Sequence, residues 1–384
     1  TAPFELGANY NYAVLPMFML VGALAGETGI AGGAFAAMKA WLGRIKGGQL
    51  FTVIAANAVF GACSGSSVAG NIVFGKLAMP ELEAAGYDRN YSMGCIAASG
   101  ALSTLIPPSM GIIMFCLVAP VTMSVGTALM GGIIPGILCG LAQMIVSYFL
   151  AKKEGVPKEP GHFTIGPVLH GLWESWPALL MPIIIVGTIT MGIVSPTEAG
   201  VIAVVYGLFA GGIIYRELKW EDIKFAFAET VRTSGRIFIV IGAAKLYTVM
   251  LTTAGFDKWV AKTMLGFSTN PTVILIMILL IFFIVTMFME SIATLTLFMP
   301  ILYPIALGVG IDPIVLSVLI TVVIGIGLVT PPVGMCIYVA CDLMDTTVGE
   351  VFPTLVPFIA ATFVCIALMV AFPQLILLPT YLMA

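Results

Sequence analysis

The sequence predicts an all-α integral membrane protein built on an inverted-topology repeat, with two re-entrant helical hairpins and two proline-broken helices. Composition supports the membrane class: 60% of the 384 residues are hydrophobic and 9% are charged, whereas a soluble domain carries roughly 25% charged residues. An internal repeat and a set of interrupted apolar stretches support the architecture.

The repeat appears when the chain is shifted by 224 residues, which lays 64–108 on 288–332 without a gap. Nine of the 45 positions are identical, and the helix breakers and turn residues coincide. The matched positions include Ser67 with Ser291, Pro80 with Pro304, Gly86 with Gly310, Asp88 with Asp312, and Pro107-Pro108 with Pro331-Pro332. Such residues set backbone geometry, so they predict two halves of related structure.

Each half is predicted to hold a hairpin followed by a broken helix. In the first half, Leu50–Phe60 and Val68–Met79 flank the polar turn 61–67. In the second half, Pro271–Phe288 and Ile292–Ile305 flank Met289-Glu290-Ser291. Most of these arms are shorter than the about 20 residues of a full span, so each pair is expected to return to its own side. The broken helices are expected at 91–121 and 313–344, each interrupted at its Pro-Pro pair.

The remaining apolar stretches predict ordinary spans at 10–25, 127–150, 177–194, 200–215, 236–253 and 347–372, with interfacial helices at 166–176 and 220–230. Five predicted crossings lie between the two hairpins: the first broken helix, 127–150, 177–194, 200–215 and 236–253. Because the number is odd, the two hairpins enter the membrane from opposite faces. Lys and Arg gather at 39–46, 89, 152–158, 216–224 and 232–236, which fall on one side of this topology. The positive-inside rule then predicts that hairpin 1 opens from the cytoplasm and hairpin 2 from outside.

The predicted division has five parts. Residues 1–49 form an N-terminal scaffold span and interfacial helix, and 50–125 the first transport core. Residues 126–270 form scaffold spans with arm helices, 271–346 the second transport core, and 347–384 a C-terminal span.

Inverted repeats with interrupted helices are typical of secondary transporters, whose site lies at the midplane where the breaks meet. A proline leaves the carbonyl four residues earlier without its helical partner. The two pairs therefore free the carbonyls of Ser103, Thr104, Gly327 and Leu328. Together with nearby hydroxyls these oxygens form an all-oxygen environment that suits a hard monovalent cation such as Na⁺. The new helix N-termini can hold a substrate carboxylate.

The candidate residues fall into two overlapping sets. The predicted substrate-binding residues are Ser66, Ser67, Pro107, Pro108, Ser109, Ser291, Thr330 and Pro332. The predicted ligands for two or more Na⁺ ions are Ser64, Gly65, Ser66, Ser103, Thr104, Glu290, Thr294, Gly327 and Thr330.

Plainer interpretations stand beside these. Gly, Ser and Pro occur in membrane helices for packing alone. Glu290 is either an ion ligand, a proton-coupled group or a salt-bridged structural residue. Glu198 and Lys245 are weaker candidates, because Glu198 follows Ser-Pro-Thr as a helix-capping residue would.

Several function classes are disfavoured. Gly70–Lys76 resembles a phosphate-binding loop, but Leu77 stands where Ser or Thr is required, so no ATP binding is expected. No basic patch suggests nucleic acid. The seven Cys are scattered without CxxC spacing and are interpreted as buried apolar residues. No G-x-S-x-G or HExxH motif is present, and the sequence predicts no enzyme.

A family resemblance emerges from the stretches GACSGSSVA at 61–69, Gly86-Tyr87-Asp88, IPPS at 106–109, PTEA at 196–199, GIDP at 310–313 and TPPVG at 330–334. In this order they resemble the large membrane subunit of tripartite ATP-independent periplasmic (TRAP) transporters. The resemblance implies an elevator-type, Na⁺-driven importer of organic acids such as C4-dicarboxylates or sialic acids, in the bacterial inner membrane. It implies two protein partners, a small four-helix membrane subunit and a periplasmic substrate-binding protein. Members usually carry further hydrophobic helix before the equivalent of Tyr10, so a missing N-terminal piece is considered.

Three alternatives remain open at this stage. A stand-alone Na⁺- or H⁺-coupled symporter or antiporter of a related inverted-repeat type would lack the small subunit. An intramembrane enzyme would turn over without a Na⁺ gradient. A channel is disfavoured because no continuous polar span is present.

Overall fold

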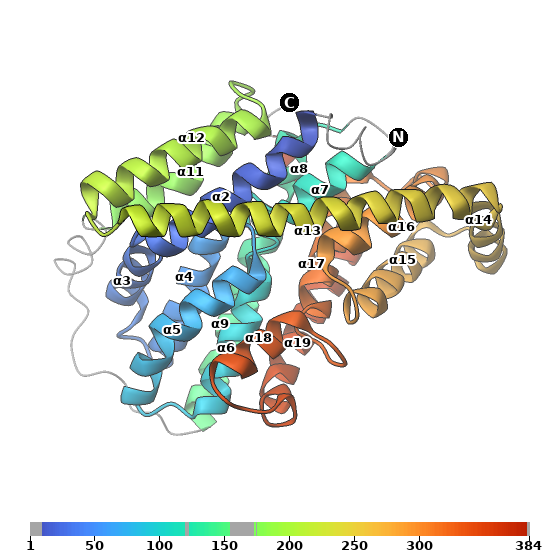
Figure 1. The fold of residues 1–384 in the computed structure, drawn as a ribbon. Helices are drawn as coiled ribbons and strands as arrows, with labels where there is room; N and C mark the ends of the chain where they lie inside the picture. Colours follow the sequence, from blue (N-terminus) through green and yellow to red (C-terminus); the bar gives the residue numbers. More distant parts are fainter. Residues whose placement is uncertain (1–9, 120–122, 154–172, 174, 382–384) are drawn as a thin grey trace.

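The protein is helical throughout the part described by the structure, a computed structural model that covers residues 10–119, 123–153, 173 and 175–381, and no strand occurs there. Figure 1 shows the helices packed around a centre in which the two halves of the chain meet. The interfacial helix predicted at 166–176 lies mostly outside the described residues, and Trp176 is the first residue of α11.

The first half of the chain contains hairpin 1 and its broken helix. Its helices are the 3₁₀ turn η1 (Tyr10–Ala13), α2 (Val14–Glu27), α3 (Ile30–Leu42), α4 (Gly48–Ser64), α5 (Ser67–Ala84), α6 (Arg89–Leu102), α7 (Met110–Val118), α8 (Val125–Gly131) and α9 (Ile133–Lys153). Hairpin 1 is α4 and α5, which pack against each other, and the first broken helix is α6 and α7.

The second half contains the matching elements after a short intervening pair. The pair is α11 (Trp176–Thr190) and α12 (Pro196–Phe209) with its π-helical end η2 (Ala210–Ile214). There follow α13 (Trp220–Thr253), α14 (Phe256–Phe267), α15 (Pro271–Thr286), α16 (Ser291–Gly308), α17 (Pro313–Gly327), α18 (Met335–Leu343), α19 (Val348–Ala371) and α20 (Gln374–Tyr381). Hairpin 2 is α15 and α16, and the second broken helix is α17 and α18.

The shared turn residues of the two halves have the same structural roles. Gly86 and Gly310 both take a left-handed backbone, with φ of 83° and 82°, a conformation that glycine adopts at low cost. Asp88 and Asp312 both cap the next helix, since each side chain accepts hydrogen bonds from two backbone N–H groups. The Pro107–Pro108 and Pro331–Pro332 peptide bonds are both cis. Matching residues therefore produce matching turns.

The correspondence extends further toward the N-terminus than the sequence comparison indicated. Helices α2 and α3 join at Gly29, which has φ of 74°, and α13 and α14 join at Gly255, which has φ of 77°. Each of these junctions is followed by a short helix that leads to a hairpin. The packing differs, because α3 packs closely on α4 whereas α14 contacts α13 and α16.

Helix α13 departs from the sequence-based expectation. The sequence predicted an interfacial helix at 220–230 and a separate span at 236–253, but the structure has one continuous helix of 34 residues. Charged residues occur between the two stretches, yet Gly235 is the one helix-weakening residue there and no proline interrupts the backbone hydrogen bonds. In Figure 1, α13 runs across the molecule from the side of α11 and α12 to α14.

Membrane-spanning capacity follows from helix length and composition. Among the described residues, five helical segments are long and apolar enough to cross a membrane: 125–153, 196–214, 220–253, 291–308 and 348–371. The pair α2 and α3, bent by 65°, qualifies as a sixth if it is one span. Helices α4, α11, α15 and α17 are apolar but shorter.

The two halves interlock at the centre. Helix α5 of hairpin 1 packs against α18, and α16 of hairpin 2 packs against α7, so each hairpin contacts the broken helix of the other half. The broken helices α6 and α17 also touch: a Cβ at Gly325 would lie 3.2 Å from Thr104 Oγ1 and 3.0 Å from the carbonyl oxygen of Ala101. The interruptions of both halves are thereby brought to one region.

Candidate functional site

Hairpin 1 reverses through three residues at its tip. Helix α4 ends at Ser64, Gly65 takes a left-handed conformation with φ of 61°, and Ser66 caps α5 by accepting a hydrogen bond from the backbone N–H of Ala69 at 3.3 Å. A Cβ at Gly65 would lie 3.1 Å from Cβ of Met110. The tip of hairpin 1 therefore rests against the start of α7, directly after the first Pro-Pro pair.

Hairpin 2 is capped differently, by an acid. Glu290 is the N-cap of α16: its carboxylate accepts from the N–H of Ile292 at 2.9 Å and from the hydroxyl of Ser291 at 3.0 Å. The Thr294 hydroxyl donates to the carbonyl of Glu290 at 3.0 Å. The positive end of α16 is thus already next to a carboxylate of the chain itself, whereas the N-terminus of α5 has only a neutral hydroxyl.

The second broken helix is tied to hairpin 2 through the backbone. The N–H groups of Val333 and Gly334 both donate to the carbonyl oxygen of Met287, at 3.1 and 3.2 Å. Gly327 lies against Thr286, so close that a Cβ there would overlap the Thr286 side chain. Met287 lies three residues before Glu290, so these contacts place the Thr330–Gly334 turn beside the tip.

The prolines leave four carbonyls without a helical donor, and these carbonyls differ in whether they accept another hydrogen bond. Thr104 accepts the hydroxyl of Ser109, Gly327 accepts the N–H of Thr330 at 3.1 Å, and Leu328 accepts the N–H of Cys336 at 2.9 Å. Among the described residues, the Ser103 carbonyl oxygen accepts no hydrogen bond across the break. Ligation of a cation by this carbonyl stays a prediction.

Some predicted residues are committed to local structure. Ser109 is fully buried and caps α7, since its hydroxyl accepts from the N–H of Ile112 at 3.1 Å. The Thr330 hydroxyl donates to the carbonyl of Ile326 at 2.7 Å. Pro107 and Pro108 are buried, whereas Pro332 is exposed. Direct contact of these side chains with a substrate stays a prediction.

The structure gathers the predicted residues into two groups, one at each hairpin. Ser64, Gly65 and Ser66 meet the break that contains Ser103, Thr104, Pro107, Pro108 and Ser109, and Ser67 lies beside Cys336 of α18. Glu290, Ser291 and Thr294 meet the break that contains Gly327, Thr330 and Pro332. The two groups are linked by Asn71 on α5, whose side chain donates to the carbonyl of Cys336 on α18 at 3.4 Å.

Two buried amides were missed in the sequence analysis. Asn57 and Asn71 lie within the apolar arms of hairpin 1, and both side chains are fully buried. An amide inside a membrane-embedded helix is costly unless it is hydrogen-bonded, so its presence there was the available signal.

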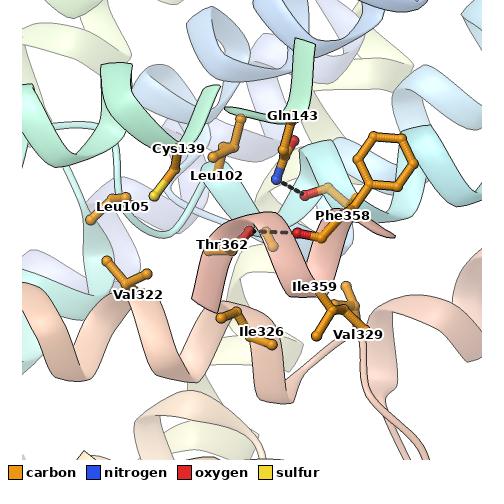
Figure 2. A pocket seen from close by; sticks show the side chains of 12 residues that line it. Leu102, Leu105, Cys139, Gln143, Val322, Ile326, Val329, Phe358, Ile359 and Thr362 are labelled. Carbon is orange, nitrogen blue, oxygen red and sulfur yellow. Dashed lines mark hydrogen bonds between the residues drawn. The ribbon is translucent and has the colours of Figure 1, made fainter. Parts of the chain in front are cut away.

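A small cavity lies beside the broken helices, between α6, α9, α17 and α19 (Figure 2). Its volume is about 20 Å³, and Gln143 at its edge donates from Nε2 to the carbonyl of Ala98 at 3.0 Å. This space fits about one water molecule. It is too small for an organic acid.

These features define an all-helical membrane protein with interrupted helices and paired hairpins, an architecture found among secondary transporters. The chain belongs to the family of the DctM component of tripartite ATP-independent periplasmic transporters, whose model matches residues 7–375. It is accordingly a transporter component and not an enzyme, which removes the intramembrane-enzyme alternative.

Curated relatives carry related names. The chain is 32% identical over 370 residues to the sialic acid TRAP transporter large permease protein SiaM of Vibrio cholerae, covering 96% of this chain and 86% of that protein. It is 30% identical over 380 residues to the C4-dicarboxylate TRAP transporter large permease protein DctM of Pseudomonas aeruginosa, covering 99% and 88%.

Two further comparisons bear on length and on fold. The chain is 33% identical over 352 residues to the isethionate TRAP transporter permease protein DctMQ of Oleidesulfovibrio alaskensis, covering 92% of this chain but only 55% of that protein. The crystal structure of the YdaH transporter of Alcanivorax borkumensis superposes with a TM-score of 0.67 at 14% identity, covering 98% and 89%. The latter likeness supports the fold alone.

Proposed function

We propose that the chain is the large membrane subunit of a tripartite importer that uses a Na⁺ gradient to take up a small organic acid. A sialic acid, a C4-dicarboxylate and isethionate are named for the relatives, so the substrate class is an organic anion. The proposed partners are a small membrane subunit and a periplasmic substrate-binding protein, and the proposed location is the bacterial inner membrane.

The difference between the two hairpin caps is the observation that supports this function most directly. The N-terminus of α5 is capped by the neutral Ser66, so its dipole and its N–H groups can attract a substrate carboxylate. The N-terminus of α16 faces Glu290, which would repel a second anion and favour a cation. The substrate anion is thus proposed to bind at the N-terminus of α5, beside a cation site at the first break, and a further cation is proposed to bind at hairpin 2.

The proposed transport step is an elevator movement, in which the two transport cores move together as one rigid body relative to the scaffold helices. Both hairpins and both broken helices interlock and would move together against α2, α3, α11, α12 and α13. Helices α9 and α19 pack on α6, so we assign them to the moving body, which differs from the sequence-based division, whereas α3 is kept with the scaffold as the sequence predicted although it packs on α4. Helix α13 contacts both α2 and α16 and would form part of the sliding surface.

The test is uptake into proteoliposomes that contain this chain with the small membrane subunit, supplied with the substrate-binding protein. Radiolabelled sialic acid, C4-dicarboxylates and isethionate are compared with an inward Na⁺ gradient, with K⁺ in its place, and with the gradient collapsed by an ionophore. We expect uptake of one acid class that requires both the gradient and the binding protein. Equal uptake under all three ionic conditions would sink the proposal of Na⁺ coupling.

A further inference from the structure

Hairpin 1 contains a buried side-chain network centred on Asn57. Its Nδ2 donates to the hydroxyl of Ser99 at 2.9 Å, and the hydroxyl of Ser103 lies 3.3 Å from both Oδ1 and the carbonyl oxygen of Asn57. All three side chains are fully buried. The network joins α4 of the hairpin to α6, in the last turn before the proline break.

Close backbone packing brings Ser103 to Gly61, about one helical turn before the hairpin tip, whereas Asn57 lies about two turns before it. A Cβ at Gly61 would lie 2.6 Å from Cβ of Ser103, so α4 and the end of α6 approach each other as closely as glycine allows. Ser64 follows Gly61 by three residues and therefore lies on the same face of α4. The network thus fixes Ser103 against the segment that carries the tip.

The second half of the chain has no counterpart of these side chains. At the shift of 224 residues, Asn57, Ser99 and Ser103 correspond to Ile281, Val323 and Gly327. There the broken helix is held by the backbone hydrogen bonds to Met287 instead. The fold itself therefore does not require the network, and a role confined to the first half is indicated.

That role is suggested by the unpaired carbonyl. Within the part of the chain that the structure describes, the one of the four freed carbonyls that accepts no hydrogen bond across the break belongs to Ser103, whose hydroxyl contacts Asn57. A cation ligand gains affinity when its position is fixed before binding, because less ordering remains to be done on binding. A carbonyl at the frayed end of a helix would otherwise be mobile.

We propose that Asn57 is a positioning residue that presents the Ser103 carbonyl oxygen to a monovalent cation at the tip of hairpin 1. Ser99 supports it by fixing the orientation of its amide. The inference rests on the proposed Na⁺ coupling and adds to it a residue outside the predicted ligand set. The proposal also distinguishes the two hairpins. Side-chain hydrogen bonds fix the first break in position, and backbone hydrogen bonds to Met287 fix the second.

The experiment measures Na⁺ affinity without transport. The purified full chain in detergent is titrated with NaCl at constant ionic strength, with choline as the replacement cation, and the unfolding temperature gives the apparent Kd. Asn57→Leu removes the network, and Ser99→Ala removes one support. Gln143→Leu is the matched control, because it also deletes a buried amide that donates a hydrogen bond to a carbonyl of α6, that of Ala98, and Gln143 makes no bond to Asn57, Ser99 or Ser103 among the described residues.

We expect Asn57→Leu to raise the apparent Kd for Na⁺ about tenfold and Ser99→Ala to raise it about threefold, as the loss of a buried hydrogen bond predicts. Gln143→Leu should lower the unfolding temperature but leave the apparent Kd for Na⁺ within about twofold of the original value. A change of about twofold is smaller than the change in Kd expected from losing one buried hydrogen bond at the site. If Asn57→Leu does not fold, the Ser99→Ala titration decides.

Other outcomes separate this inference from the function on which it rests. A Na⁺ response in the original chain with an unchanged Kd in the Asn57 and Ser99 variants overturns the role of Asn57 and leaves Na⁺ coupling intact. An equal Kd shift in Gln143→Leu also overturns it, since the effect is then general. No Na⁺-specific stabilisation of the original chain overturns both proposals.

Discussion

Asn71 and Cys336, 265 positions apart in the sequence, are joined by a hydrogen bond from Nδ2 to the carbonyl oxygen at 3.4 Å. Asn71 lies in the second turn of α5, and Cys336 lies in the first turn of α18. The bond therefore connects hairpin 1 to the broken helix of the other half. It makes the interlocked centre a single unit whose parts are expected to move together.

Asn71→Leu should lower the free energy of unfolding by about 1 kcal/mol, because the hydrogen bond from a buried side-chain amide is lost. Unfolding in SDS, followed by helical circular dichroism, measures the change. Asn90→Leu is the control, since Asn90 is partly exposed at the start of α6. Equal or greater stability of Asn71→Leu would show that the bond does not hold the two halves together.

Gly65→Ala should impair uptake more than Gly86→Ala. Both glycines have left-handed backbones, with φ of 61° and 83°, so both variants incur a backbone cost of about 1 kcal/mol. Only at Gly65 would the new methyl meet another element, Met110 at the start of α7, because nothing lies within 4 Å of the position at Gly86. Uptake rates normalised to the amount of folded protein make the comparison. Equal losses would mean that the contact of the tip with α7 is unimportant.

Ser66→Asp should retain stability and abolish uptake of organic anions. Aspartate is as good a helix cap as serine, but its charge at the N-terminus of α5 would repel a substrate carboxylate. Ser124→Asp, at the cap of α8 away from the tips, serves as the control. Substrate-dependent thermal stabilisation and uptake are measured for both variants. Persistent uptake by Ser66→Asp would rule out carboxylate binding at this helix end.

Glu290→Gln should weaken Na⁺ stimulation of uptake while preserving the fold. Glutamine keeps an acceptor oxygen for the N–H of Ile292 but removes the negative charge from the tip of hairpin 2. Glu198→Gln is matched to it, because Glu198 also accepts a backbone N–H at a helix start, from Ser195 at 2.7 Å. The Na⁺ concentration for half-maximal uptake should rise about tenfold for Glu290→Gln alone, as the loss of one charge-assisted contact predicts. The same value in both variants would assign Glu290 a capping role only.

The sequence predicted the turns of the two hairpins because the helix ends there depend on local chemistry, whereas the re-entrant course of the hairpins stays a prediction. Gly65 and Ser66 form the turn of hairpin 1, and Asp88 and Asp312 start the broken helices, each for reasons visible within four residues. The membrane class and the family likewise followed from composition and from short stretches of turn residues.

Sequence reasoning did not predict the continuity of α13 or the correspondence between the α2–α3 and α13–α14 junctions. The charges around Arg232 and Arg236 suggested a break, yet α13 continues because nothing removes its backbone hydrogen bonds. The correspondence of Gly29 with Gly255 was hidden, because the surrounding residues differ while the backbone turn is shared.

By itself the sequence determined where the helices stop, because a proline lacks an N–H and a glycine accepts a positive φ whatever surrounds it. Only the tertiary structure decided which of the freed carbonyls remain unpaired. The Ser109 hydroxyl reaches Thr104, the Cys336 N–H reaches Leu328, and Asn57 holds Ser103 with its carbonyl left open. A hydrogen bond depends on distances of a few tenths of an ångström, and those are set by the path of the chain through each break and by the packing of α4 on α6, neither of which the sequence shows.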